Sequence, residues 1–110
     1  MATMMREYDA RLRPLTNALE DALNDLGAKN SHWTKDGTGV TATLNKSIMD
    51  RGDNIAVKVV KGKVAVISEF ATWGRDCSVF GMLSKRLERD CEHVLDGIDY
   101  WLEENRCASR

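Results

Sequence analysis

The sequence has few of the residues from which small functional sites are usually built. It contains one proline, three cysteines and 6% aromatic residues in 110 positions, and its 16 Lys and Arg nearly balance its 17 Asp and Glu. A net charge of −1 excludes an overall basic field that would hold nucleic acid. No apolar run approaches the roughly 20 residues that cross a bilayer, and the N-terminus lacks the apolar region of a signal peptide. We therefore expect a cytoplasmic protein that does not contact a membrane.

The cysteines and histidines lack the spacing of a metal or redox site. Cys91 and His93 are two residues apart, so on a helix they point to nearly opposite sides and cannot clamp one ion. Cys77 and Cys91 fall on an apolar stripe and are expected to be small buried hydrophobes, which leaves Cys107 as the reactive thiol. No P-loop, dinucleotide fingerprint or G-x-S-x-G sequence occurs. The sequence thus predicts no catalytic residue, no metal and no cofactor.

The sequence does contain an apolar stripe with helical spacing near each end. From Asp76 to Glu104, and again from Met5 to Leu26, apolar residues recur at steps of three and four. Such steps put each set on one face of a helix, which must be buried. Gly27 is a natural C-cap for the first helix. Pro14 either opens this helix or kinks a longer one, and the continuous stripe favours a longer helix bent near Pro14.

The middle of the chain has the alternation of β-strands. Residues 31–35 are a short candidate strand, and an Asp36-Gly37 turn leads into the alternating run 40–44. A loop over 45–54 precedes a hairpin formed by 55–60 and 63–73, joined at Lys61-Gly62. A two-residue turn fixes the register of this hairpin and defines its core face, with the pairs Val59–Val64, Val57–Val66 and Ile55–Ser68.

These elements predict a single α+β domain over residues 1–110, with a frayed tail over 106–110. We expect the order α-β-β-β-β-α, in which an antiparallel meander of three to four strands carries the N- and C-terminal helices on one face. The other face of the hairpin is more apolar than a solvated face needs to be, which indicates a partner and favours a homodimer. Its predicted interface residues are Ala56, Val60, Ala65 and Ile67.

Two charged clusters offer further candidate surfaces. The last helix carries an acidic stripe that includes Glu92, Asp96, Asp99 and Glu103. Like charges at this spacing repel, and carboxylates are unfavourable near the C-terminal end of a helix, so we interpret the stripe as a docking surface for a basic partner. A solvated helix face, or neutralisation by the hairpin lysines, would also explain it.

The second cluster lies at the hairpin tip, where Lys58, Lys61 and Lys63 gather. Such lysines can contact phosphates, although they also keep a β-hairpin soluble and discourage edge pairing. The sequence therefore predicts a small non-catalytic interaction module, of the adaptor, chaperone or inhibitor type found among bacterial and phage accessory factors. It would dock a protein partner through the acidic stripe or the open sheet face. The alternative is a nucleic-acid-binding protein that uses the lysine-rich tip.

Overall fold

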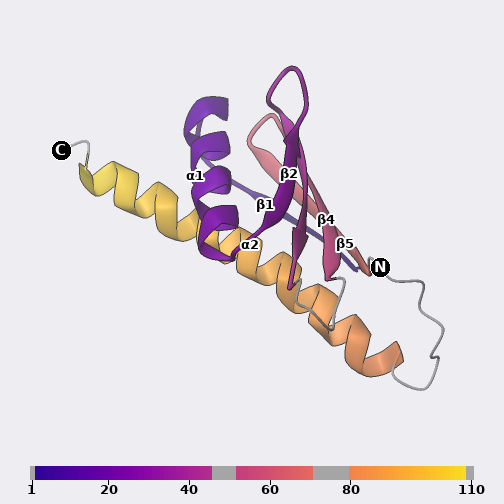
Figure 1. Ribbon diagram of the computed structural model, residues 1–110. Helices are drawn as coiled ribbons and strands as arrows, with labels where there is room; N and C mark the ends of the chain where they lie inside the picture. Colours follow the sequence, from indigo (N-terminus) through magenta and orange to yellow (C-terminus); the bar gives the residue numbers. More distant parts are fainter. Residues whose placement is uncertain (1, 46–51, 71–79, 109–110) are drawn as a thin grey trace.

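The computed structural model describes residues 2–45, 52–70 and 80–108. A five-stranded antiparallel sheet, in the order β1-β5-β4-β3-β2, packs against two helices (Figure 1). In chain order the elements are β1 Ala2–Glu7, α1 Leu12–Asp25, β2 Lys29–Trp33, β3 Gly39–Leu44, β4 Asp53–Val60, β5 Lys63–Phe70 and α2 Phe80–Ala108. The predicted α+β class, with both helices on one face of an antiparallel sheet, is confirmed. The sheet has five strands where three to four were predicted.

The additional strand, β1, lies where the sequence predicted the start of the first helix. Residues 2–7 pair antiparallel with β5, and Met4 lies opposite Val66. Burial alternates along β1, with Met4 more buried than its exposed neighbour Met5. Met5 and Tyr8 are three residues apart, so they also fit a helical stripe, and a segment this short is ambiguous from its spacing alone. Pairing with β5 decides the conformation.

The first helix is therefore shorter than predicted, and the bent helix through Pro14 is wrong. α1 begins at Leu12, which puts Pro14 in its first turn. A proline is tolerated there because its missing N–H would have no partner within the helix. The predicted end of the helix is confirmed: Gly27 has a φ of 72°, and the N–H of Ala28 donates to the carbonyl of Leu23 at 3.0 Å.

The central hairpin follows the prediction. Lys61 and Gly62 form a two-residue turn with φ values of 49° and 79°, the signs of a type I′ turn. The predicted pairs Val59–Val64, Val57–Val66 and Ile55–Ser68 are all present. β4 begins at Asp53 rather than after the predicted loop. The predicted continuation of β5 to Trp73 lies outside the described residues.

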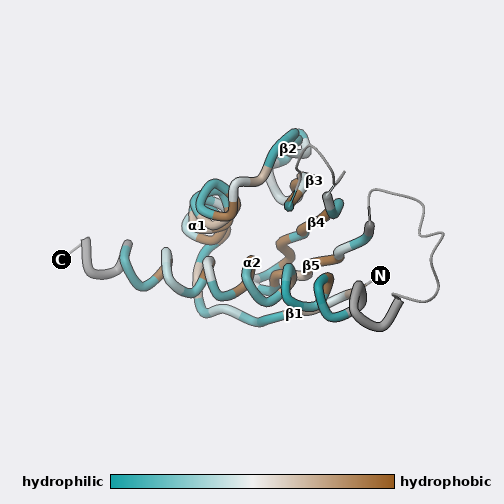
Figure 2. The backbone as a smooth tube through the Cα atoms, turned by 60° about the horizontal axis from the view of Figure 1, so that its bottom comes forward, coloured by the Kyte–Doolittle hydropathy of each residue, from teal (hydrophilic) through white to brown (hydrophobic). Residues whose placement is uncertain are grey.

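The core lies between the two helices and one face of the sheet (Figure 2). α1 packs mainly on α2, and α2 covers β1 and β5. The helices approach closely at Gly97, where an added Cβ would lie 2.7 Å from Cβ of Ala22. The largest fully buried apolar side chains are Leu15, Leu19, Ile55, Leu87, Leu95, Ile98, Val64, Val66 and Val94. Within the described part of the chain, no element covers the opposite face of the sheet.

α2 is longer at its C-terminal end than predicted. It continues to Ala108, and so includes residues 106–108 of the predicted tail. No glycine or proline interrupts residues 98–108, so nothing in the sequence stops the helix earlier. No helix among the described residues is long and apolar enough to span a membrane.

Candidate functional site

The face of the sheet opposite the helices exposes apolar side chains at its centre. Val60 is 50% exposed and Ile67 36%, while Ala56 and Ala65 are partly exposed. Met5 of β1, 64% exposed, lies opposite Ala65. The structure thus brings the four predicted interface residues together and adds Met5, which the sequence prediction had assigned to a helix. A patch of adjacent apolar side chains of this kind is typical of a binding surface.

We call this surface the open face. It consists of the side chains that point away from the helices on four neighbouring strands. They are Thr3, Met5 and Glu7 of β1, Lys63, Ala65, Ile67 and Glu69 of β5, Asn54, Ala56, Lys58 and Val60 of β4, and Thr41 and Thr43 of β3.

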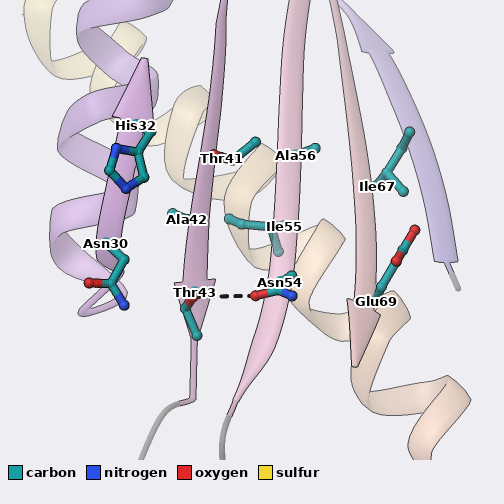
Figure 3. Close-up of a pocket in the computed structure, with 10 residues that line it drawn as sticks. All are labelled: Asn30, His32, Thr41, Ala42, Thr43, Asn54, Ile55, Ala56, Ile67 and Glu69. Carbon is teal, nitrogen blue, oxygen red and sulfur yellow. Dashed lines mark hydrogen bonds between the residues drawn. The ribbon is translucent and has the colours of Figure 1, made fainter. Parts of the chain in front are cut away.

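A shallow groove of about 450 Å³ crosses the open face between β2 and β5 (Figure 3). Ala56 and Ile67 contribute apolar surface, whereas His32 and Glu69 lie at opposite sides of the groove. The hydroxyl of Thr43 donates to Oδ1 of Asn54 at 3.4 Å across two strands. The groove therefore combines an apolar strip with hydrogen-bonding groups at its margins, a combination that suits the side chains of a protein partner.

The three lysines of the alternative nucleic-acid site do lie together at the hairpin tip. Lys58, Lys61 and Lys63 line a second hollow of about 270 Å³, whose other walls are apolar. Glu7 of β1 is the register partner of Lys63, so a negative charge lies beside the cluster. The described tip carries no exposed aromatic side chain on which a base would stack.

The predicted acidic docking residues are exposed on α2, but two of them have an internal partner. Glu92, Asp96, Asp99 and Glu103 are all exposed. Nη1 of Arg6, on β1, lies 3.1 Å from Oδ1 of Asp96 and also binds Oδ2 of Asp99. Arg6 rather than a hairpin lysine thus relieves the repulsion in the middle of the stripe. The sequence analysis missed this pairing because it did not predict β1. The pairing explains how Asp96 and Asp99 are tolerated close together on α2.

The cysteine prediction is confirmed for Cys91, the one cysteine whose side chain is described. Its Sγ lies 3.7 Å from the carbonyl oxygen of Val66 and 3.8 Å from that of Ala2. Burial raises the pKa of the Cys91 thiol to about 11, so the thiol stays protonated and unreactive. Cys77 and the side chain of Cys107 lie outside the described residues. Among the residues described, no three His, Cys, Asp or Glu side chains are grouped to hold a metal ion.

A buried polar cluster that the sequence prediction missed joins the sheet to α2. Asp53 at the start of β4 is fully buried, and Asp90 of α2 is 5% exposed. Nδ2 of Asn45 donates to Oδ2 of Asp53 and to Oδ1 of Asp90, at 2.9 Å each. Nε of Arg86 donates to Oδ2 of Asp53 at 2.8 Å. The second oxygens of the two carboxyls, Asp53 Oδ1 and Asp90 Oδ2, are buried and have no hydrogen-bond partner among the residues that the structure describes.

When both carboxyls ionise they carry two negative charges, and among the described residues one guanidinium, that of Arg86, accompanies them. Burial raises the pKa of Asp90 to about 7, and the neighbouring Asp53 adds to the effect. Asp90 comes three residues after Leu87 and four before Val94, so its place on the apolar stripe was an available signal. The two carboxyls are buried, and the hydrogen bonds of the cluster tie β4 to α2.

No family model, characterised protein or solved structure matches this chain. Its function must therefore be argued from its own surfaces. Of the three predicted sites, the open face is the one that exposes apolar side chains, Val60 and Ile67 among them.

Proposed function

We propose that this chain is a small cytoplasmic protein-interaction module without catalytic activity, which binds a protein partner through the open face. The observation that carries the proposal is the uncovered apolar centre formed by Met5, Val60 and Ile67, which are 64%, 50% and 36% exposed. Removing apolar surface from water lowers the free energy by about 25 cal/mol per Å², so burial of these side chains by a partner is favourable. Both helices lie on the other face of the sheet and cannot provide one (Figure 1).

The open face supports this function better than the acidic stripe does. Asp96 and Asp99 already bind Arg6 within the chain, so a basic partner would have to compete with that contact. The open face combines exposed apolar side chains with charged groups, Lys63 and Glu69 near its ends and Lys58 beside Ala65, and protein interfaces combine apolar and charged side chains in this way. The groove beside Ala56 and Ile67 adds a concave region where partner side chains can be received.

The substitution Ala65→Asp tests the proposal, because Ala65 lies at the centre of the open face between Met5 and Lys58. We expect the variant to fold, since Ala65 is only partly buried, and to bind its partners at least roughly tenfold more weakly because a carboxylate is desolvated in the interface. Asn17→Asp, on an exposed position of α1, adds the same charge elsewhere and is the matched control.

The measurement is quantitative mass spectrometry of proteins retained by each immobilised variant, with copies of the chain itself counted among them. The native chain and Asn17→Asp should retain the same proteins, and Ala65→Asp should lose them. Equal retention by all three proteins would contradict the proposal.

The alternative function is nucleic-acid binding, and the observation in its favour is that Lys58, Lys61 and Lys63 lie together at one end of the open face. It predicts retention of a DNA or RNA probe that weakens steeply with salt and is abolished by Lys61→Glu. Under protein binding, Lys61→Glu should weaken capture less than Ala65→Asp does, because Lys61 lies in the turn at the end of the open face, whereas Ala65 lies between Met5 and Lys58.

A further inference from the structure

We infer that the partner of the open face is a second copy of this chain, packed face to face about a two-fold axis that runs across the strands and sets β5 antiparallel to β5. The inference rests on the proposed function and names its partner. It is carried by the order of side chains along β5 and by the neighbours that the sheet register places beside them.

The outward side chains of β5 have a charge pattern that complements the same pattern on a second, antiparallel copy of the strand. From the hairpin tip to the end of the strand they are Lys63, Ala65, Ile67 and Glu69. A two-fold axis between Ala65 and Ile67 sets Lys63 of one copy opposite Glu69 of the other, and Ala65 opposite Ile67. Because the axis repeats each contact, the interface gains two charge pairs around an apolar centre, as an isologous interface requires.

The two charged residues are available for such pairing. Lys63 and Glu69 are both exposed, and neither has a salt bridge within the described residues, although Glu7 of β1 is the register partner of Lys63. The register partner of Glu69 on β4 is the uncharged Asn54. Glu69 therefore lacks a cation beside it on β4, and Lys63 of a second copy would supply one.

The neighbouring strands fit the same operation. On β4 it sets Val60 opposite Asn54 and Lys58 opposite Ala56 of the other copy, since these four side chains follow the register of β5. Val60, half exposed in the single chain, then faces the groove that Asn54 and Ala56 help to line. On β1 it sets Met5 opposite Thr3. No like charges oppose each other in these pairs.

Charge also selects this arrangement over its alternative. An axis parallel to β5 would set Lys63 opposite Lys63 and Glu69 opposite Glu69, which repel. β4 and β5, the longest strands of the open face, have eight residues each and extend about 26 Å, and four strands spaced about 4.8 Å apart give the face a width of about 19 Å. A face of this size falls at the small end of specific interfaces.

A pair of charge reversals tests the inference. Lys63→Glu and Glu69→Lys each put like charges at both ends of the interface, so each variant alone should dimerise roughly 10- to 100-fold more weakly. Mixed in equal amounts, the two variants should form a dimer again, because the surplus acidic groups of one face the surplus basic groups of the other. Glu20→Lys, on an exposed position of α1, is the matched control and should dimerise like the native chain.

The readout is solution mass by light scattering, with thermal melting to show that every variant is folded. A native dimer, two monomeric variants and a dimeric mixture are expected. A native chain that stays monomeric at high concentration, single variants that remain dimeric, or a mixture that stays monomeric would each overturn the inference. If it fails while Ala65→Asp still loses captured proteins of another sequence, the proposed function stands and only its partner was misidentified. If Ala65→Asp retains everything, the proposed function fails as well.

Discussion

The buried cluster predicts that Asp90→Asn makes this protein less sensitive to rising pH. In the folded chain the two carboxyls of Asp53 and Asp90 share the amide of Asn45, and one guanidinium, that of Arg86, binds Asp53. Asn has the shape of a protonated Asp and never ionises. The substitution therefore keeps the neutral form of the side chain at every pH.

The direction of the effect follows from the pKa of Asp90. Burial, with a contribution from Asp53, raises that pKa from 3.8 to about 7, so between these values the folded state binds more protons than the unfolded state. The stability that Asp90 contributes is fully present below pH 4 and is lost as the pH rises to about 7. The free energy of unfolding falls by at most about 1.4 kcal/mol for each pH unit. The whole shift in the pKa of Asp90 limits the total decrease to the order of 4 kcal/mol.

The assay is urea denaturation of the native chain and the variant from pH 4 to pH 8. The free energy of unfolding of Asp90→Asn, minus that of the native chain, should rise with pH across this range and level off above about pH 7. Titrating groups that do not interact with Asp90 cancel in the difference, so the difference reports on the buried cluster. Glu92→Gln removes a carboxylate from an exposed position on the same helix and is the control, whose difference the rise for Asp90→Asn should exceed. A flat difference for Asp90→Asn would refute the assignment of the proton to this buried carboxyl.

Two further substitutions test how the elements are joined. Gly97→Ala should destabilise the fold by about 1–3 kcal/mol in urea denaturation, because the new Cβ meets Ala22 at 2.7 Å; a more stable variant would show that helix propensity outweighs this contact. Arg6→Gln should cost about 0.5–2 kcal/mol by loss of the ion pairs with Asp96 and Asp99, and high salt should reduce the loss. If the stability lost in Arg6→Gln did not change with salt, the loss would come from the packing of the arginine stem instead of the ion pairs.

The parts of the fold that depend on neighbours in the sequence were predictable. The hairpin of β4 and β5 takes its register from a two-residue turn, so its core pairs follow from counting outward from Lys61-Gly62. The four apolar residues of the open face follow from the same alternation. The C-cap at Gly27 is likewise a local matter of backbone conformation.

The parts that depend on distant pairing were not predictable in this way. β1 becomes a strand because it pairs with β5, some 60 residues away in the sequence, while the spacing of its apolar residues also fits a helix. Because of this one difference, the sequence analysis placed neither Met5 on the open face nor Arg6 beside the acidic stripe. The link between Asp53 and Asp90 through the amide of Asn45 likewise forms only when α2 packs on the sheet. Asp90 was detectable as a carboxyl on an apolar stripe, whereas Asp53 was assigned to a loop.

The measurement that tests the central claim most directly is the rate at which peroxide oxidises Met5, followed by mass spectrometry of its peptide over a range of protein concentrations. Met5 is 64% exposed in the single chain, so it should oxidise fast whenever the open face is uncovered. If a second copy covers this face, oxidation of Met5 should slow as the concentration of the native chain rises, while Ala65→Asp should oxidise equally fast at every concentration. A native chain whose Met5 oxidises at one fast rate across the whole range would contradict the claim that the open face is an interface between copies.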